Sequence, residues 1–197
     1  MSFPRIANGL LVCSVFLLPA SALAADPLET AIAVCATCHG VDGNSTDPRY
    51  PKIAGMDQVY LLRQLRAFAS GQRRDETMAG ILATIDPGDF PRLARYYSER
   101  KPTPGKVSDP ELAARGKVLY HDDHTANGGR SCAGCHQPDG QGNARFPRVA
   151  GQHQAYALKQ LEDFRSGRRA TDRQMTAVAK GLTDEEMKAL VEYMAGL

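Results

Sequence analysis

The chain has 197 residues, of which 43% are hydrophobic and 23% are charged, and its formal net charge is +2. This length accommodates one ordinary domain or two small ones. The small net charge gives no reason to expect a nucleic acid or an anionic membrane surface as the partner. Composition therefore predicts a globular protein, and any function must be sought in the motifs.

The first element in chain order is an expected export signal over residues 1–25. Arg5 supplies a positive start, residues 10–18 form an apolar run, and residues 22–24 (Ala-Leu-Ala) form a cleavage site. The run is shorter than a membrane-spanning helix requires. Lipid modification of Cys13 is the alternative, but the apolar run continues past this residue. We therefore expect a cleaved signal peptide and a periplasmic protein.

The next feature is the pentapeptide Cys35-Ala-Thr-Cys38-His39, and a second copy, Cys132-Ala-Gly-Cys135-His136, stands in the second half of the chain. This pattern is the attachment signature of c-type haem, in which two thiols bind the porphyrin and the adjacent imidazole reaches the iron. After cleavage of the signal, every remaining cysteine lies in one of the two motifs. The sequence therefore predicts two covalently bound haem c groups. The expected attachment residues are Cys35, Cys38, Cys132 and Cys135, and the expected proximal iron ligands are His39 and His136.

Two other chemistries use paired cysteines. A thioredoxin-like redox disulfide lies near a βαβ pattern, and no such pattern is visible in this sequence. A zinc site normally takes four ligands, and joining the two motifs into one site would leave Cys and His groups over. Haem attachment is the interpretation that uses all of these groups.

Helical patterns follow the first motif, and no convincing run of alternating strand residues is present. Residues 57–70 place apolar side chains at helical spacing, and a glycine suited to a helix end follows them. Another helix is expected to begin at residues 86–87 and to carry Phe90 and Leu93 on its apolar face. The first half is therefore predicted to be helical.

A stretch rich in Pro and Gly at residues 101–107 is typical of a linker. Beyond it, residues 108–111 (Ser-Asp-Pro-Glu) form a capping box that predicts the start of a helix. This helix is expected to extend to about Tyr120, with Gly116 and Tyr120 on one face.

The second half repeats the pattern of the first. Residues 153–166 show the same helical spacing and also end at a glycine, and a last helix is expected to open with the capping box at residues 183–186. We therefore expect an all-α fold.

An internal duplication covers most of the mature chain. Residues 50–55 (Tyr-Pro-Lys-Ile-Ala-Gly) match residues 146–151 (Phe-Pro-Arg-Val-Ala-Gly), and the residues of the following helices match as well. We therefore predict two homologous domains with one haem each, at residues 26–100 and 108–197.

The duplication also selects the second iron ligand in each domain. Met78 and Met175 occupy matching positions, each at the same separation from its motif His. A methionine near helices is more often core filler, but the paired recurrence favours ligation here. The other candidates have no residue of the same type at the matching position of the other repeat. This holds for Met56, Met187, Met194 and His153, and an insertion without a counterpart contains His121 and His124. His/Met ligation raises the reduction potential and suits a haem that passes single electrons.

Three further sets of residues are weighed against structural roles. The Pro51 and Pro147 loops are expected either to present a backbone carbonyl to the motif His or to form ordinary turns. Arg73, Arg74, Arg168 and Arg169 fit a solvated basic rim better than partners of haem propionates. Tyr60 and Tyr156 fit core packing and propionate binding equally well.

With these residues assembled, the chain resembles the dihaem class I cytochromes c of the cytochrome c4 type over about residues 27–197. One departure is Gln137, where the family usually has Gly. The resemblance implies two cytochrome c folds related by pseudo-twofold symmetry, with the haem propionates near the interface. It also implies a periplasmic electron carrier between respiratory donors and a terminal oxidase or reductase complex, with possible peripheral membrane association.

We therefore expect an electron carrier and not an enzyme. The main alternative is a cytochrome subunit of a membrane-associated dehydrogenase or oxidase complex. A dihaem redox enzyme, such as a peroxidase or a thiosulfate-oxidising cytochrome, and a small-molecule sensor are disfavoured, because an open iron position conflicts with paired Met ligands.

Overall fold

The computed structural model describes residues 26–122 and 131–197, and every regular element in these ranges is helical. The expected signal peptide at residues 1–25 lies outside the described residues. The first half contains α1 (Pro27–His39), α2 (Gln58–Ala69), α3 (Glu76–Leu82), the 3₁₀ turn η1 (Pro87–Asp89) and α4 (Phe90–Ser98). The second half contains α5 (Pro110–His121), α6 (Cys132–His136), α7 (Gln154–Ser166), α8 (Arg173–Lys180) and α9 (Asp184–Gly196). The expectation of an all-α fold is confirmed.

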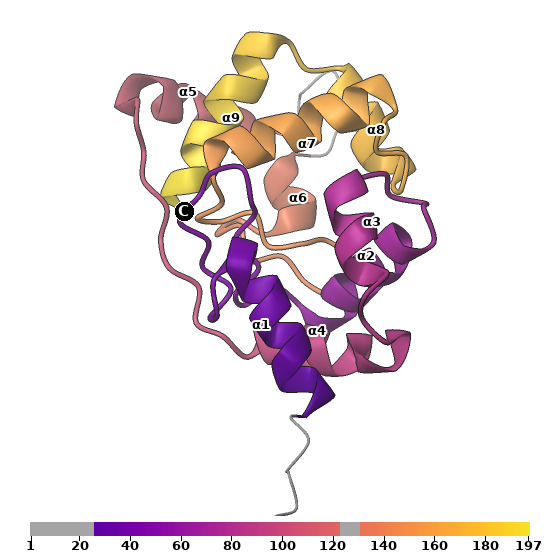
Figure 1. Cartoon of the computed structure of the whole chain (residues 1–197). Coiled ribbons are helices and arrows are strands. Elements are labelled where there is room, and N and C mark those ends of the chain that lie inside the picture. Colours follow the sequence, from indigo (N-terminus) through magenta and orange to yellow (C-terminus); the bar gives the residue numbers. More distant parts are fainter. Residues whose placement is uncertain (1–25, 123–130) are drawn as a thin grey trace, which may run out of the picture.

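The two halves form separate lobes that lie against each other. In Figure 1, α1–α4 form the lower lobe and α5–α9 the upper lobe, and an extended segment connects α4 to α5. The duplication appears in the element order, since α7, α8 and α9 repeat α2, α3 and α4. The limits of the two domains, at residues 26–100 and 108–197, stay a prediction.

Side-chain caps explain where several helices begin. Asp57 accepts hydrogen bonds from two backbone N–H groups at the start of α2, and Asp109 accepts one at the start of α5. Thr183 and Glu186 form the expected capping box of α9. The capping box expected at residues 108–111 is wrong, because Asp109 is the cap and the backbone N–H of Ser108 donates to Glu192 of α9.

The core of the second half forms where α5 crosses α9. Tyr120 and Met187 are fully buried in this core, together with Leu190. Gly116 allows the two helices to approach closely, because a methyl group there would overlap the carbonyl oxygen of Ala189. The shared face of Gly116 and Tyr120 expected from the sequence is therefore the face that packs on α9.

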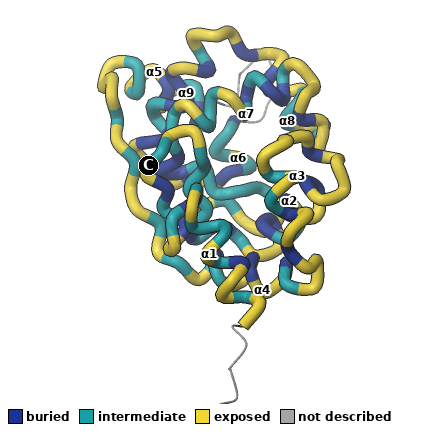
Figure 2. Tube along the Cα trace, viewed as in Figure 1, coloured by how far each residue is buried: buried dark blue, intermediate teal, exposed yellow. Residues whose placement is uncertain are grey.

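The first half holds two smaller buried clusters. One includes Phe68, Phe90 and Leu93, and the other includes Tyr60 and Tyr97. Figure 2 shows the buried positions on the inward sides of the helices, with exposed positions along the outer turns. Both clusters border Cys35, so the motif of the first half sits against the core.

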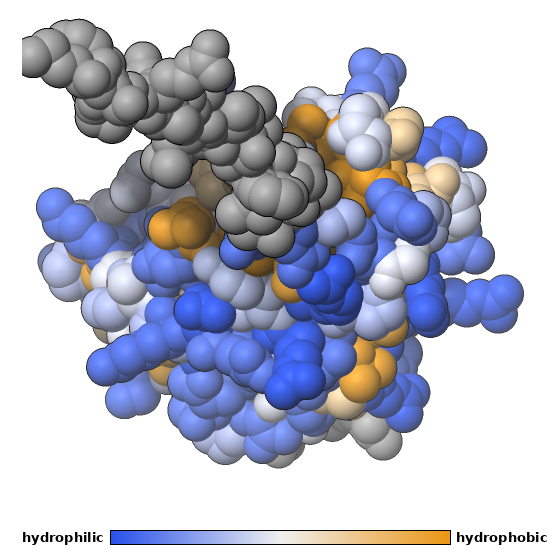
Figure 3. Space-filling model, turned by 60° about the horizontal axis from the view of Figure 1, so that its bottom comes forward, coloured by the Kyte–Doolittle hydropathy of each residue, from blue (hydrophilic) through white to orange (hydrophobic). Residues whose placement is uncertain are grey.

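The outer surface carries few large apolar side chains. On the face in Figure 3, hydrophilic residues predominate, and apolar residues occur in small separate groups. Within the described ranges, no helix combines the length and apolar character needed to cross a membrane.

Candidate haem-binding sites

Each Cys-x-x-Cys-His motif lies at the C-terminal end of a helix. The first motif closes α1, whereas the second occupies the short helix α6. All four motif cysteines are free and half-buried. Burial raises the pKa of Cys132 to about 11, the opposite of the lowered pKa that marks a reactive redox thiolate. The thioredoxin-like alternative therefore finds no support.

The two motif histidines are held in the same way. The carbonyl oxygen of Pro51 lies 2.9 Å from Nδ1 of His39, and that of Pro147 lies 2.8 Å from Nδ1 of His136. A carbonyl oxygen only accepts, so Nδ1 carries the proton and Nε2 is left with a free lone pair. Of the two roles that the sequence left open for the Pro loops, the structure shows the presentation of a carbonyl to the histidines. Such a bond fixes ring orientation and makes the imidazole a better ligand.

Both histidines are buried and neutral. His39 and His136 are each 8% exposed. Burial lowers the pKa of both imidazoles, and the hydrogen bond to the proline carbonyl only partly opposes this shift. Neutral imidazole is the form that binds a metal.

Met78 and Met175 occupy equivalent positions in short helices. Each backbone N–H donates to the Asp that caps its helix, with distances of 3.0 Å to Asp75 and 3.0 Å to Asp172. Each Met side chain packs against the core of its own lobe. The cap recurs as Asp-x-x-Met in both halves, a sequence signal for the role of these aspartates that the sequence analysis missed.

One continuous cavity of about 760 Å³ runs through both lobes. Among its lining residues are the motif residues of both halves and Met78 and Met175. The cavity therefore brings together, in each lobe, two thiols, one imidazole and one thioether. Met56 and Met194 also line it, so lining alone does not distinguish a ligand from a packing residue.

Other groups that the sequence raised as ligand candidates have different partners. Nε2 of His153 lies 2.9 Å from the carbonyl oxygen of Ser45, and Nε2 of His121 lies 3.0 Å from the hydroxyl of Tyr193. Met187 is fully buried in the second core. His124 lies outside the described residues. The described ranges contain no group of three or more His, Cys, Asp or Glu side chains that is suited to a metal ion.

The residues present fit two haem c groups. The donor set supplies thiols for covalent attachment and both soft and nitrogen ligands for iron. Two buried polar atoms beside the cavity, the hydroxyl of Tyr97 and Nε of Arg169, have no hydrogen-bond partner among the described residues. Unpaired buried polar atoms are uncommon in proteins and indicate a missing partner.

Two buried arginines cross the boundary between the lobes. Arg73 is 7% exposed and donates to Gln64 of its own lobe and to Tyr156 and Gln160 of the other. Its guanidinium also lies 4.4 Å from the ring centroid of Phe68. Within the described residues, it forms no ion pair with a carboxylate, although the charge of Asp75 acts on it.

Arg169 makes the mirror-image set of contacts. It is 8% exposed, and it donates to Gln160 of its own lobe and to Tyr60 and Gln64 of the other. The two amide oxygens thus each accept from both arginines. The expected solvated rim is wrong for Arg73 and Arg169, because packing between the lobes buries them.

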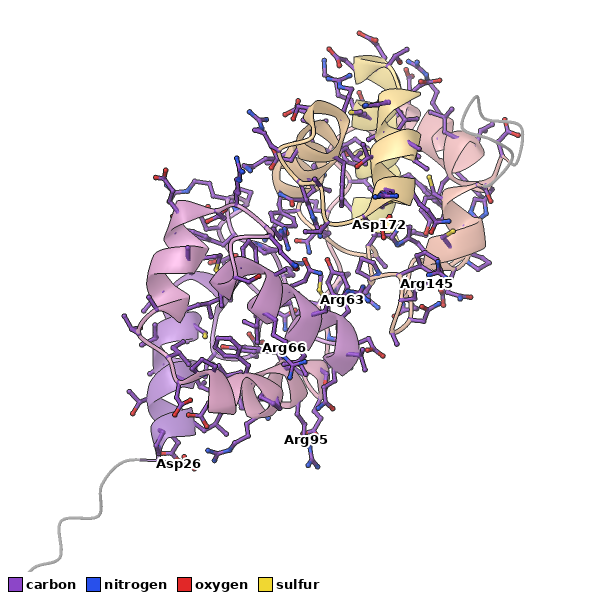
Figure 4. All side chains as sticks on the ribbon, turned by 90° about the vertical axis from the view of Figure 1, so that its right-hand side faces the viewer. Asp26, Arg63, Arg66, Arg95, Arg145 and Asp172 are labelled. Carbon is purple, nitrogen blue, oxygen red and sulfur yellow. The ribbon has the colours of Figure 1, made fainter. Side chains whose placement is uncertain are left out.

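Further hydrogen bonds join the lobes. The side chain of Gln152 both accepts from the backbone N–H of Lys52 and donates to its carbonyl oxygen, each at 2.9 Å. Arg63 donates to the carbonyl oxygen of Arg145 at 2.9 Å, and Figure 4 shows both residues at the junction of the lobes. Sequence reasoning missed these contacts, because they depend on how the repeats dock.

The cytochrome c family model matches residues 29–103 and 113–197. The chain belongs to the cytochrome c family. Cytochrome c4 of Azotobacter vinelandii is 40% identical over 179 residues, which cover 84% of this chain and 85% of that relative. The crystal structure of reduced cytochrome c4 from Pseudomonas stutzeri matches with a TM-score of 0.80 and 39% identity, over 87% of this chain and 96% of that one. The thiosulfate dehydrogenase electron acceptor of Thiomonas intermedia is 34% identical, over 90% of this chain and 83% of that relative.

The family assignment confirms the tandem arrangement of two cytochrome c domains and the two haem c groups. The resemblance to the cytochrome c4 type is likewise confirmed. This cytochrome c is a dihaem electron-transfer protein and not an enzyme.

Gln137 is the non-glycine residue with positive φ in the described part of this cytochrome c. Its φ of 73° and ψ of 154° match those of Gly40, at 77° and 151°, in the first motif. This conformation is nearly restricted to glycine and costs a residue with a side chain about 1–3 kcal/mol. The local turn after the motif therefore imposes its conformation on Gln137.

Replacing Gln137 with Gly is expected to stabilise the folded holoprotein by about 1 kcal/mol. Gly removes the backbone strain at the positive φ, and its greater conformational freedom in the unfolded chain offsets part of this gain. Guanidinium unfolding followed by circular dichroism measures the difference. The matched control is Gly40→Gln, which should destabilise the first domain, because a side chain there meets the carbonyl oxygen of Asn44 at 3.3 Å. An unchanged or lower midpoint for Gln137→Gly would contradict the strain.

Proposed function

We propose that this cytochrome c is a periplasmic carrier that passes single electrons between a respiratory donor and a terminal oxidase or a similar acceptor. In this proposal, Cys35 and Cys38 attach the first haem, and Cys132 and Cys135 attach the second. The observation that carries it is that each lobe places one motif His and one equivalent Met beside the continuous cavity.

The axial ligands in this proposal are His39 and Met78 in the first domain and His136 and Met175 in the second. The support is the free Nε2 of each histidine, opposite the Nδ1 that the proline carbonyl holds. The aspartate caps support the methionines, because they fix the backbone of both in the same local geometry. With these four residues as ligands, neither iron would have a vacancy for a substrate.

The haem, when bound, supplies a one-electron couple whose potential the thioether ligand raises. The chain's own residues hold that couple in apolar surroundings, where the extra positive charge of the ferric form is penalised. The side chains of Met78 and Met175 pack against the two cores, and this packing would hold them in place in both oxidation states. A site that changes little between the two states suits rapid electron transfer.

Arg73 and Arg169 are proposed to pair with haem propionates. Two buried guanidinium groups that share amide acceptors and form no ion pair within the described residues need anionic partners, and the propionates are the anions that the cofactor brings. Nε of Arg169 is still unpaired and available. In this proposal, the two arginines bind the haem propionates and also join the two lobes by hydrogen bonds.

Replacing Arg73 with Gln is expected to lower the reduction potential, because removing a buried positive charge favours the ferric form. An effect on the order of 1 kcal/mol, or tens of millivolts, follows for charges in partly buried surroundings. Potentiometric titration of the holoprotein measures it. The control is Arg74→Gln, because Arg74 is adjacent and exposed. Equal shifts in the two variants would contradict the role of Arg73.

The relatives suggest a source of electrons. One relative is named a thiosulfate dehydrogenase electron acceptor, so the donor in this proposal is a periplasmic dehydrogenase. The second candidate function, a cytochrome subunit of such a complex, is favoured by the same similarity. Purification of the tagged chain from its host separates the two, since a subunit copurifies with stoichiometric partners and a free carrier does not.

Anaerobic potentiometric titration of the purified holoprotein tests the carrier proposal. We expect two one-electron components of equal amplitude and oxidation of the reduced protein by a membrane fraction that contains the terminal oxidase. Cell fractionation should place the protein in the periplasm. Rapid turnover of peroxide by the native protein, or recovery in the cytoplasm, would contradict the proposal.

A further inference from the structure

Tyr97 in α4 has a buried hydroxyl beside the side chain of Cys35. The residue is 3% exposed, and within the described residues its hydroxyl makes no hydrogen bond of good geometry. Its side chain lines the cavity and belongs to a cluster that borders Cys35. Leaving a phenol unpaired in a core costs about 1–3 kcal/mol, so the structure calls for an acceptor on the cavity side.

The ring is held in this position from several directions. The backbone carbonyl of Tyr97 accepts from the N–H groups of Gly55 at 3.0 Å and of Arg100 at 3.2 Å. Tyr96 packs edge-on against the ring, with centroids 5.0 Å apart. Even a methyl group at Gly43 would come within 2.9 Å of Cδ1 of Tyr97. These contacts fix the backbone and the ring of Tyr97, so the fold sets the position of its hydroxyl.

The second domain has no equivalent donor among its described residues. Met194 occupies the position that matches Tyr97 in the repeat, and it also lines the cavity. The phenol in the second core, that of Tyr120, donates to the carbonyl oxygen of Gln137 at 2.9 Å. A free phenol donor beside the motif cysteine is thus a feature of the first site.

We propose that Tyr97 is a positioning residue that makes the two haem sites inequivalent. Its hydroxyl donates a hydrogen bond to Sγ of Cys35, which is a thioether sulfur once the haem is attached, and this raises the potential of the first haem. The sulfur is a weak acceptor, but reduction makes the attached group more electron-rich and strengthens the bond. The ferrous state is therefore favoured. This inference rests on the haem attachment at Cys35 in the proposed function.

The test compares Tyr97→Phe with the wild-type holoprotein. We expect the equilibrium constant for reduction of one haem to fall about threefold, which corresponds to part of the net worth of a neutral hydrogen bond, while the other haem keeps its potential. The variant Met78→Leu alters the first site alone, so the reduction potential that changes in this variant is the one that belongs to the first haem. Tyr96→Phe and Tyr120→Phe are matched controls, because their hydroxyls donate to backbone carbonyls, and we expect both potentials to stay unchanged in them.

Unfolding of the same variant gives an independent readout. Loss of a satisfied hydrogen bond should lower the unfolding midpoint of Tyr97→Phe, whereas loss of a hydroxyl that is unpaired in the holoprotein should raise it. Unchanged potentials, or a raised midpoint, would overturn the inference. Failure of the proposed function is distinguishable, since it would show as missing Met ligation in the wild-type spectra, before any change at Tyr97.

Discussion

Replacing Met78 or Met175 with Leu is expected to lower the reduction potential of the haem in that domain and to open its iron to carbon monoxide. Leucine preserves the volume of the side chain but removes the sulfur, so the core should survive while the ligand is lost. Axial ligands set haem potentials over a range of roughly 0.8 V. A decrease on the order of 0.1 V is therefore a modest expectation for the loss of a thioether.

The controls for this prediction are Met56→Leu and Met194→Leu. Both methionines line the same cavity, so they test whether any neighbouring sulfur has the same effect. Potentiometry and carbon monoxide difference spectra of the reduced proteins measure the outcome. If the control variants bind carbon monoxide and the Met78 and Met175 variants do not, the ligand assignment is wrong.

Replacing Gly116 with Ala is expected to destabilise the second domain by about 3 kcal/mol or more, at the upper end of the cost of overpacking. The added methyl group would overlap the carbonyl oxygen of Ala189 and lie 2.9 Å from Cβ of Tyr193. Backbone atoms cannot move aside as a flexible side chain does, so α5 and α9 would have to separate. Because this crossing forms the core around Tyr120 and Met187, the loss should extend through the domain.

Gly80 provides the matched control, because it lies inside helix α3 with no atom within 4 Å of the position of an added Cβ. Gly80→Ala should be neutral or should stabilise the protein by up to about 1 kcal/mol through helix propensity. Denaturant unfolding of both holoproteins measures the contrast. Similar midpoints for the two variants would contradict a close contact between α5 and α9.

Local patterns in the sequence were sufficient to predict much of this molecule. Helical spacing predicted α2 and α7 to within a residue or two, and the capping box at Thr183 predicted the start of α9. The same local logic raised carbonyl groups of Pro51 and Pro147 at the histidines as one of two possibilities, and the structure shows them there. These features depend on residues that are close in sequence or that repeat in both halves.

The features that the sequence did not predict depend on docking of the two repeats. Arg73 and Arg169 look like exposed cations in a polar stretch, and only the contact between lobes buries them against Gln64 and Gln160. Gln137 is a different case, because the departure from Gly is visible in the sequence but its positive φ is not. A residue with a side chain disfavours a positive φ, but the turn that follows the motif imposes this conformation on Gln137.

The central claim is that a protein thioether and an imidazole occupy the two axial positions of both irons. The most direct measurement is a quantitative near-infrared and electron paramagnetic resonance spectrum of the oxidised, purified holoprotein at neutral pH. We predict two low-spin haems per chain, each contributing to the charge-transfer band from methionine sulfur to ferric iron. A high-spin or water-ligated haem in the resting protein would contradict the account.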